Sequence, residues 1–248
     1  MTVDLLRVEI GVIWRLDGRG RLPGPEELVI GVAADGMTAA VRADVPDPVA
    51  TELLDLVSQG VPSHPGHPPD ILARCAALLG SGRAVSGGPA AFEGRAVSGG
   101  PCYLVRPPLT FEAPADVIRS DDPSHAARLR RPRPANWEPG EWDELLAGGA
   151  GAPWAMIVED GQVAAICHSA RLTPEGAEAG TWTSPAFRGR GYAAATTAAW
   201  AGLLPGVRLF YSTSADNHSS QRVAQRLGLD AIGWLWKLTP HGSTASPA

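Results

Sequence analysis

The stretch Ser184–Ala195, SPAFRGRGYAAA, places two glycines beside two arginines, between a strand-like run and an alanine-rich run. Glycines let the backbone approach a ligand closely, and the first N–H groups of a helix point outward at the positive end of its dipole. Arg188 and Arg190 add formal positive charge beside Gly189 and Gly191. These residue types suit the binding of a pyrophosphate. The alternative is a plain structural turn, because glycine is common in this chain, with 29 glycines in all.

The segment Gly189–Ala194 also fits the fingerprint of dinucleotide-binding folds, and Asp216 lies near the position of an acid that would bind the ribose. Two features argue against this interpretation. Residues 185–188 separate the first glycine from the preceding strand, and the chain after Asp216 is too short to complete a doubly wound sheet. No glycine-rich loop precedes Lys237, the only lysine, so the sequence does not predict a nucleoside-triphosphate loop either.

Composition narrows the class of protein. Hydrophobic residues make up 44% of the 248 positions and charged residues 19%, which is enough apolar material for a sizeable core. The formal charge of −5 argues against nucleic acid or an anionic membrane as a partner. The first residues lack the basic flank of a signal peptide, and no apolar run approaches membrane-spanning length, so we expect a cytoplasmic protein.

The sequence predicts no metal site and no disulfide framework. The cysteines, Cys75, Cys102 and Cys167, are odd in number and widely spaced, without a CxxC pair. His64 and His67 lie in a proline–glycine loop without neighbouring ligands, which is typical of solvated histidines.

Composition and periodicity divide the chain into an N-terminal α/β region (1–106), a proline-rich linker with short helical turns (107–140), a second region (141–239) and a disordered tail (240–248). Asp160-Gly161 predicts a hairpin turn. Predicted strands are Val8–Trp14, Leu28–Val32, Ala39–Val41, Trp154–Val158, Val163–Ala170, Glu178–Thr183, Val207–Thr213 and Ala231–Leu238. Predicted helices are Pro46–Val57, Pro69–Leu79, Trp142–Leu146, Ala193–Leu204 and Ser219–Leu227.

The octapeptide GRAVSGGP occurs twice, at Gly82–Pro89 and Gly94–Pro101. The unit is far too short for a solenoid repeat. We interpret it as a local duplication in a surface loop, and a loop that contacts a ligand is the alternative.

Two motifs in residues 154–238 resemble the GCN5-related N-acetyltransferases (GNAT). The family's Q/R-x-x-G-x-G/A motif between a strand and a helix stands here as Arg188–Ala193. Its next motif, a strand followed by N-x-x-A/S and a helix ending in L-G-F, stands as LFYSTSADNHSSQRVAQRLGL. The matching positions of that second motif are Asn217, Ser220, Leu227, Gly228 and Leu229. The order of predicted elements also agrees with the family.

The resemblance implies an α/β (α+β) fold with a mixed, mostly antiparallel sheet flanked by helices, and acetyl-CoA (coenzyme A) as the cofactor. Backbone N–H groups of the glycine-rich turn would bind the pyrophosphate, the end of the preceding strand would pair with the pantetheine arm, and the asparagine would lie beside the pantetheine or the leaving sulfur. The implied cofactor-binding residues are Thr181, Trp182, Thr183, Arg188, Gly189, Arg190, Gly191, Tyr192, Ala193, Ala194, Asn217 and Ser220.

Acetyl transfer to an amine requires a base. Glu178 lies on the strand that enters the turn, where many family members carry a glutamate, and apolar surroundings beside Trp182 would raise the pKa of its carboxyl toward neutrality. A solvated glutamate at a strand edge is the alternative. His168, on the preceding strand, is the second candidate, although a lone strand histidine is more often structural.

The acid that protonates the departing thiolate is left open. Many relatives have a tyrosine in the helix after the asparagine, but Ala224 stands there and cannot donate a proton. The substitutes are Ser212, Ser219, Ser220, a water, or Tyr211 from the strand.

The sequence thus predicts an acetyl-CoA-dependent N-acetyltransferase, with direct attack by a primary amine of a small molecule or a peptide N-terminus in a ternary complex. The alternatives are a catalytically silent acyl-CoA-binding module and a lobe used mainly for homodimerisation. Residues 1–120 carry no recognised motif and would form a substrate domain or a degenerate lobe. No nucleic acid and no membrane is expected as a partner.

Overall fold

The computed structural model describes residues 1–80, 94–129 and 131–241. The chain forms two compact units, and the units are not contiguous in sequence. Of the described residues, unit 1 contains those within Met1–Tyr103, Ser212–His218 and residues 231–241; unit 2 contains those within Leu104–Tyr211 and Ser219–Asp230. The domain boundaries expected from composition stay a prediction.

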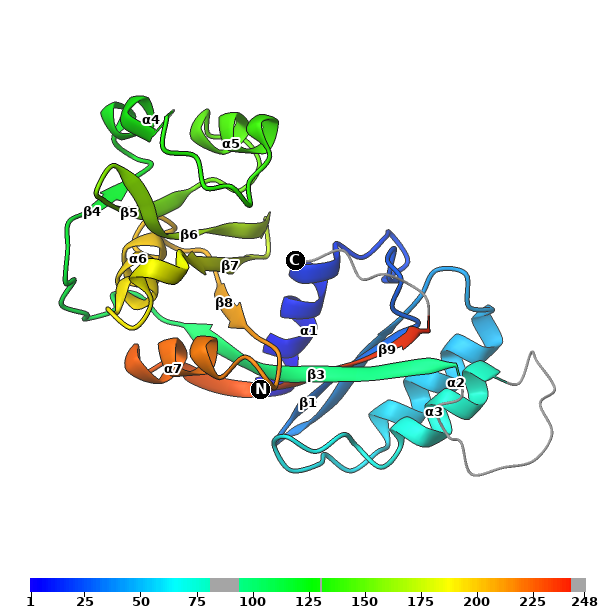
Figure 1. Ribbon diagram of the computed structural model, residues 1–248. Coiled ribbons are helices and arrows are strands. Elements are labelled where there is room, and N and C mark those ends of the chain that lie inside the picture. The colour runs from blue at the N-terminus through cyan, green and yellow to red at the C-terminus, as the bar shows by residue number, and fades with distance from the viewer. Residues whose placement is uncertain (81–93, 130, 242–248) are drawn as a thin grey trace. The chain divides into compact units, whose positions relative to one another are not determined.

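Unit 1 is built on four strands in the order β2-β1-β9-β3, with β1 antiparallel to both β2 and β9. Its helices cover both faces of the sheet (Figure 1). The strands are β1 (Leu28–Ala33), β2 (Gly36–Val41), β3 (Arg95–Val105) and β9 (Asp230–Pro240), and the helices are α1 (Thr2–Trp14), α2 (Asp47–Ser58) and α3 (Leu72–Gly80).

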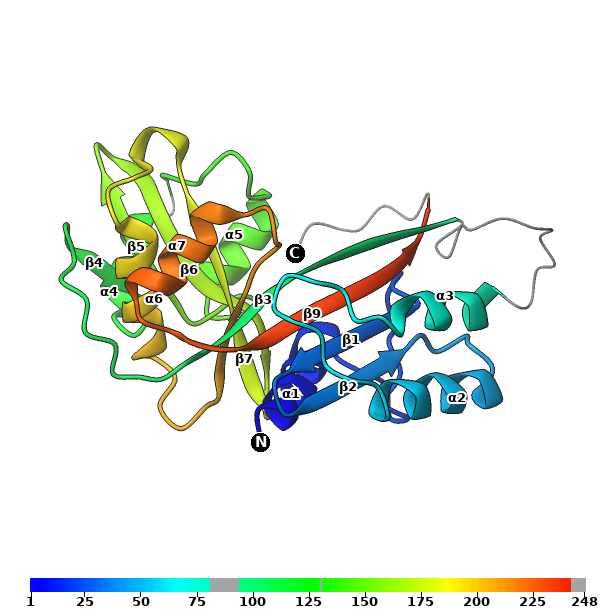
Figure 2. The same cartoon turned by 90° about the horizontal axis from the view of Figure 1, so that it is seen from below.

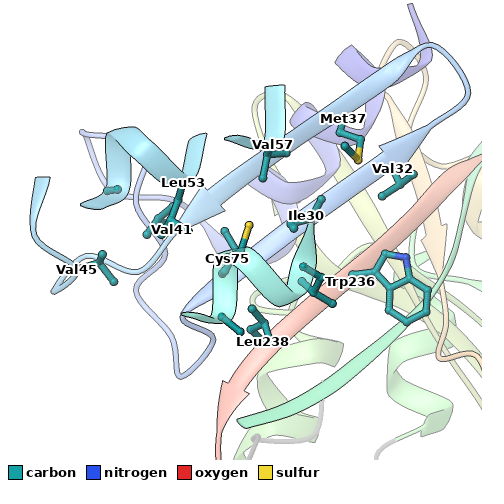
Figure 3. Packing of buried hydrophobic residues seen from close by; sticks show 14 residues of the cluster. Ile30, Val32, Met37, Val41, Val45, Leu53, Val57, Cys75, Trp236 and Leu238 are labelled. Atoms are coloured by element: carbon teal, nitrogen blue, oxygen red, sulfur yellow. The ribbon is translucent and has the colours of Figure 1, made fainter. Parts of the chain in front are cut away.

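Successive residues of β1 face opposite sides of the sheet, and their contacts show which helices cover each side. Ile30 and Val32 belong to a cluster of buried side chains with α2 and α3 (Figure 3). Gly31 points the other way, where a Cβ would lie 3.1 Å from Leu6 Cβ of α1. The glycine therefore lets α1 approach the sheet closely.

The prediction of a strand at Val8–Trp14 is wrong, because these residues form the second half of α1. The β-branched residues of this run favour a strand locally. However, the buried positions Val3, Leu6 and Ile10 recur at helical spacing, and packing against the sheet overrides the local preference.

Unit 2 contains five strands in the order β8-β7-β6-β5-β4. The pairs β4–β5, β5–β6 and β6–β7 are antiparallel, whereas β7–β8 is parallel. The strands are β4 (Val117–Arg119), β5 (Trp154–Glu159), β6 (Gln162–Thr173), β7 (Gly176–Thr183) and β8 (Leu209–Ser212). The helices are α4 (Pro123–Leu129), α5 (Pro139–Leu146), the short 3₁₀ helix η1 (Pro185–Phe187), α6 (Tyr192–Ala201) and α7 (His218–Arg226).

The two faces of this sheet carry different helices (Figures 1 and 2). Trp154 and Met156 of β5 pack with α4 and α5. Ile157 of the same strand packs with Tyr192 and Ala195 of α6. Below, the face that packs with α4 and α5 is called the α5 face, and the face that packs with α6 is called the α6 face. This mixed, mostly antiparallel sheet flanked by helices confirms the predicted fold class.

The sequence also raised local expectations for a hairpin turn, a linker and a repeated octapeptide. The hairpin turn at Asp160-Gly161 is confirmed, with φ of 50° and 71°. Residues 107–140, expected to be a linker, contain the paired strand β4 and helix α4. The prediction that the second GRAVSGGP copy forms a surface loop is wrong, because most of this copy lies in β3. The first copy falls outside the described residues, as does the predicted tail beyond His241.

Across the described ranges, no helix is both long and apolar enough to span a membrane.

Candidate functional site

A turn rich in glycine leads from β7 into α6, as the sequence predicts. Gly189 and Gly191 have φ of +81° and +85°, in the left-handed region that favours glycine. Gly191 is the N-cap of α6, and the first helical hydrogen bond joins Ala195 N–H to Gly191 O. The N–H groups of residues 192–194 therefore have no acceptor within the helix, so they can bind an anion.

The space around the two glycines differs. A Cβ at Gly189 would have no atom within 4 Å, whereas one at Gly191 would lie 3.6 Å from Phe111 and 3.7 Å from Arg226 Nη1. Arg226, at the end of α7, thus brings a third guanidinium beside the turn. No local pattern in the sequence indicates this proximity, because it depends on how α7 packs.

The two arginines of the turn differ as well. Arg190 forms an ion pair of 3.0 Å with Glu159 and lies 5.1 Å above the Phe187 ring. The hydroxyl of buried Tyr192 donates to the same Glu159 carboxylate, so this side chain fixes the turn to the end of β5. Arg188 is exposed, with Nε 3.5 Å from Thr183 O.

Strands β7 and β8 separate just before the turn. Among the described residues their parallel pairing comprises Ala177 with Leu209 and Glu178 with Phe210, whereas β7 continues to Thr183. Beyond Glu178, the backbone groups of β7 that point toward β8 are thus available to an extended ligand. These residues include Thr181, Trp182 and Thr183, the segment predicted to pair with pantetheine.

The two candidate bases lie on one face of the sheet. His168 is directly opposite Gly180 in the β6–β7 pair, and Glu178 precedes Gly180 by two residues on β7. Glu178 is only 6% exposed. The solvated strand-edge alternative for Glu178 is therefore wrong.

His168 is partly buried on the α5 face. Its ring lies edge-on to Trp137 at 5.1 Å, and a Cβ at Gly180 would come within 2.5 Å of Nε2. Nδ1 is buried and has no hydrogen-bond partner among the described residues. Burial, and secondarily Arg171, lowers the pKa of His168 to about 4, so the imidazole is neutral at neutral pH.

On the α6 face, hydroxyl groups meet where the strands separate. The Tyr211 hydroxyl lies 2.6 Å from Ser220 Oγ of α7 and 3.5 Å from Thr181 Oγ1 of β7. Ala224, which replaces the tyrosine of many relatives, is fully buried. Thr181 and Ser220, predicted separately, are thus brought together by Tyr211. Asn217 belongs to unit 1, where it is exposed.

Comparisons with known proteins identify a family for part of the chain. Residues 110–230 match the model of the acetyltransferase (GNAT) domain family. None of the curated proteins matches the sequence.

Three solved structures resemble the chain over most of its length. A GCN5-related N-acetyltransferase from Kribbella flavida is 17% identical, covering 98% of this chain and 96% of that one, at a TM-score of 0.48. A GCN5-related N-acetyltransferase-like protein from Streptococcus suis is 13% identical, covering 97% and 98%, at 0.46. A tandem GNAT protein from the clavulanic acid biosynthesis pathway is 15% identical, covering 98% and 96%, at 0.46.

Similarities this low identify no substrate for this chain. The family match, together with the glycine-rich turn and the sheet around it, confirms the predicted resemblance. Residues 110–230 are an acetyltransferase domain of the GNAT family, and the chain is an acyltransferase.

Proposed function

We propose that this protein is an acetyl-CoA-dependent N-acetyltransferase in which a primary amine attacks the thioester directly within a ternary complex. The observation that carries the proposal is the continuity of two features. The part of β7 beyond its pairing with β8 leads directly into a turn with unpaired helical N–H groups. One extended ligand bearing a pyrophosphate matches both features.

The roles of the binding residues follow from this arrangement. The N–H groups of Gly189–Ala194 bind the pyrophosphate, with Arg188 adding charge at the mouth of the turn. Thr181–Thr183 pair with the pantetheine arm, and one amide of this segment polarises the thioester oxygen. Ser220 and Asn217 contact the pantetheine or the sulfur. The acceptor is an amine of a small molecule or a peptide N-terminus.

Glu178 is proposed to take the proton of the amine, directly or through a water, because its side chain is the buried carboxylate on the strand that enters the turn. His168 is the second candidate. Its low pKa makes it the weaker base, since a basic group works best when its pKa lies near the working pH. The N-terminal region is proposed to serve the acceptor, and a homodimer and a cytoplasmic location stay predictions.

Acetyl-CoA is expected to raise the free energy of unfolding, because it binds the native state alone. At a hundredfold excess over Kd the gain should be about 3 kcal/mol. Thermal unfolding with and without acetyl-CoA measures the gain, and thiol release with a panel of primary amines measures turnover. Stabilisation without thiol release would mean a silent binding module, and the absence of both would contradict the proposed function.

Gly189→Ala is expected to weaken acetyl-CoA binding by about tenfold or more, since the methyl group would occupy the open space of the turn. Gly206→Ala is a matched control: its φ is +78° and a Cβ there also meets no atom within 4 Å, but it lies in the loop after α6. Both changes should cost about 1–2 kcal/mol of stability through backbone strain. Calorimetric titration with acetyl-CoA measures the affinity of each variant. Equal affinity of the two variants would show that the phosphates bind elsewhere.

A further inference from the structure

Tyr211 occupies a special position on β8. The last residue of β8 paired with β7 is Phe210, so Tyr211 is the first residue beyond the point where the strands separate. Its side chain is 2% exposed. The hydroxyl reaches both sides of the separation, with Thr181 of β7 at 3.5 Å and Ser220 of α7 at 2.6 Å.

The other described tyrosines do not share this position. The Tyr192 hydroxyl is bound to Glu159 at the far end of the glycine-rich turn, and Tyr103 lies in β3 of unit 1. Ser220, beside Tyr211, is half-buried and belongs to the first turn of α7. Hydroxyls thus extend from the buried strand end to a helix that reaches solvent.

We propose that the Tyr211 hydroxyl protonates the departing thiolate, with Ser220 returning a proton to it. This inference rests on the proposed function, which places the thioester where β7 and β8 separate. It assigns to a strand residue the role that Ala224 cannot fill from α7.

The proton balance closes. The amine nitrogen forms a bond to the carbonyl carbon while the C–S bond breaks, and the electron pair of that bond goes to sulfur. The thiolate takes the proton of Tyr211, the phenolate takes the proton of Ser220, and Ser220 takes one from water. The proton that the amine loses goes to Glu178 and then to water, so none is gained or lost overall.

The surroundings keep Tyr211 in its protonated form. Burial raises the pKa of the phenol, and the nearby Cys167 and Glu178 raise it further, while Ser220 and Thr181 act in the opposite direction. The net shift is upward, so the hydroxyl holds its proton at neutral pH and is able to donate it.

Tyr211→Phe is expected to lower kcat by about 10²-fold or more, with the acetyl-CoA Kd little changed, because the change removes only the hydroxyl. Tyr103→Phe deletes a tyrosine hydroxyl in unit 1 and should leave kcat unchanged. Circular dichroism and thermal unfolding verify that Tyr211→Phe folds. If the parent turns over and Tyr211→Phe does so equally fast, the inference is wrong while the proposed function stands.

A second measurement separates proton donation from a purely structural role. Incorporation of 3,5-difluorotyrosine at position 211 keeps the hydroxyl but lowers the pKa of the phenol. The rate should then fall as pH rises through that lowered pKa, since a phenolate has no proton to give. The same replacement at Tyr103 should not move the profile. An unmoved profile at 211, with the fold intact at each pH, would overturn the inference, and a parent without any turnover would overturn it together with the proposed function.

Discussion

Glu178→Gln is expected to lower kcat by roughly 10²–10⁴-fold, which is the usual contribution of a general base. Glutamine keeps the size of the side chain but cannot accept the proton of the amine. The Kd for acetyl-CoA should change little, because the proposed phosphate contacts come from backbone groups of Gly189–Ala194. Steady-state kinetics over a range of amine concentrations, with Kd from calorimetry, give the two numbers separately.

Glu175→Gln is the matched control for this change. Glu175 is exposed in the turn that precedes β7, so the same loss of charge lies outside the proposed site. The rate of the parent should fall at low pH, where its base is protonated, and the residual rate of Glu178→Gln should not follow that fall. Near-parent turnover by Glu178→Gln would instead direct attention to His168.

The second large effect concerns stability. The pKa of His168 is lowered from 6.5 to about 4 in the folded protein. Between these values the unfolded chain binds a proton that the folded chain does not, so stability is lost as pH falls through this window. From pH 7 to pH 4 the imidazole should cost the folded state about 3 kcal/mol.

The test compares the free energy of unfolding of the parent with that of His168→Leu at both pH values. Every other titrating group contributes to both proteins, so the difference between them isolates His168. His64→Leu, at an exposed histidine of unit 1, is the control for replacing an imidazole outside the sheet of unit 2. A parent-minus-variant difference that stays constant with pH would mean that His168 titrates alike in both states.

Local patterns predicted much of the fold, including the glycine-rich turn that leads into α6. The glycine-rich turn, its helix and the strand before it are encoded in one continuous segment, residues 176–201, and the hairpin turn in two residues, Asp160-Gly161. Glycine's access to positive φ gives such turns a local signature. Local patterns were wrong for the second half of the helix Thr2–Trp14. Its β-branched residues favour a strand, and only tertiary packing makes this segment helical.

Contacts between distant segments could not be predicted in the same way. Arg226 lies beside Gly191, and Tyr211 between Thr181 and Ser220, because of how α7 packs within unit 2. The sequence left Tyr211 as one of several alternatives for the acid. Its position at the separation of β7 and β8 depends on strand register, which no local pattern specifies.

The position of β9 has a consequence for synthesis and folding. In unit 1 this strand lies between β1 and β3, and Leu28 near the start of the chain pairs with Leu238 near its end. Until the ribosome has made β9, the β1 edge has no partner on that side, and contacts over such sequence separations form slowly. The nascent unit therefore exposes an apolar strand edge for most of its synthesis, a state prone to aggregation and suited to chaperone binding.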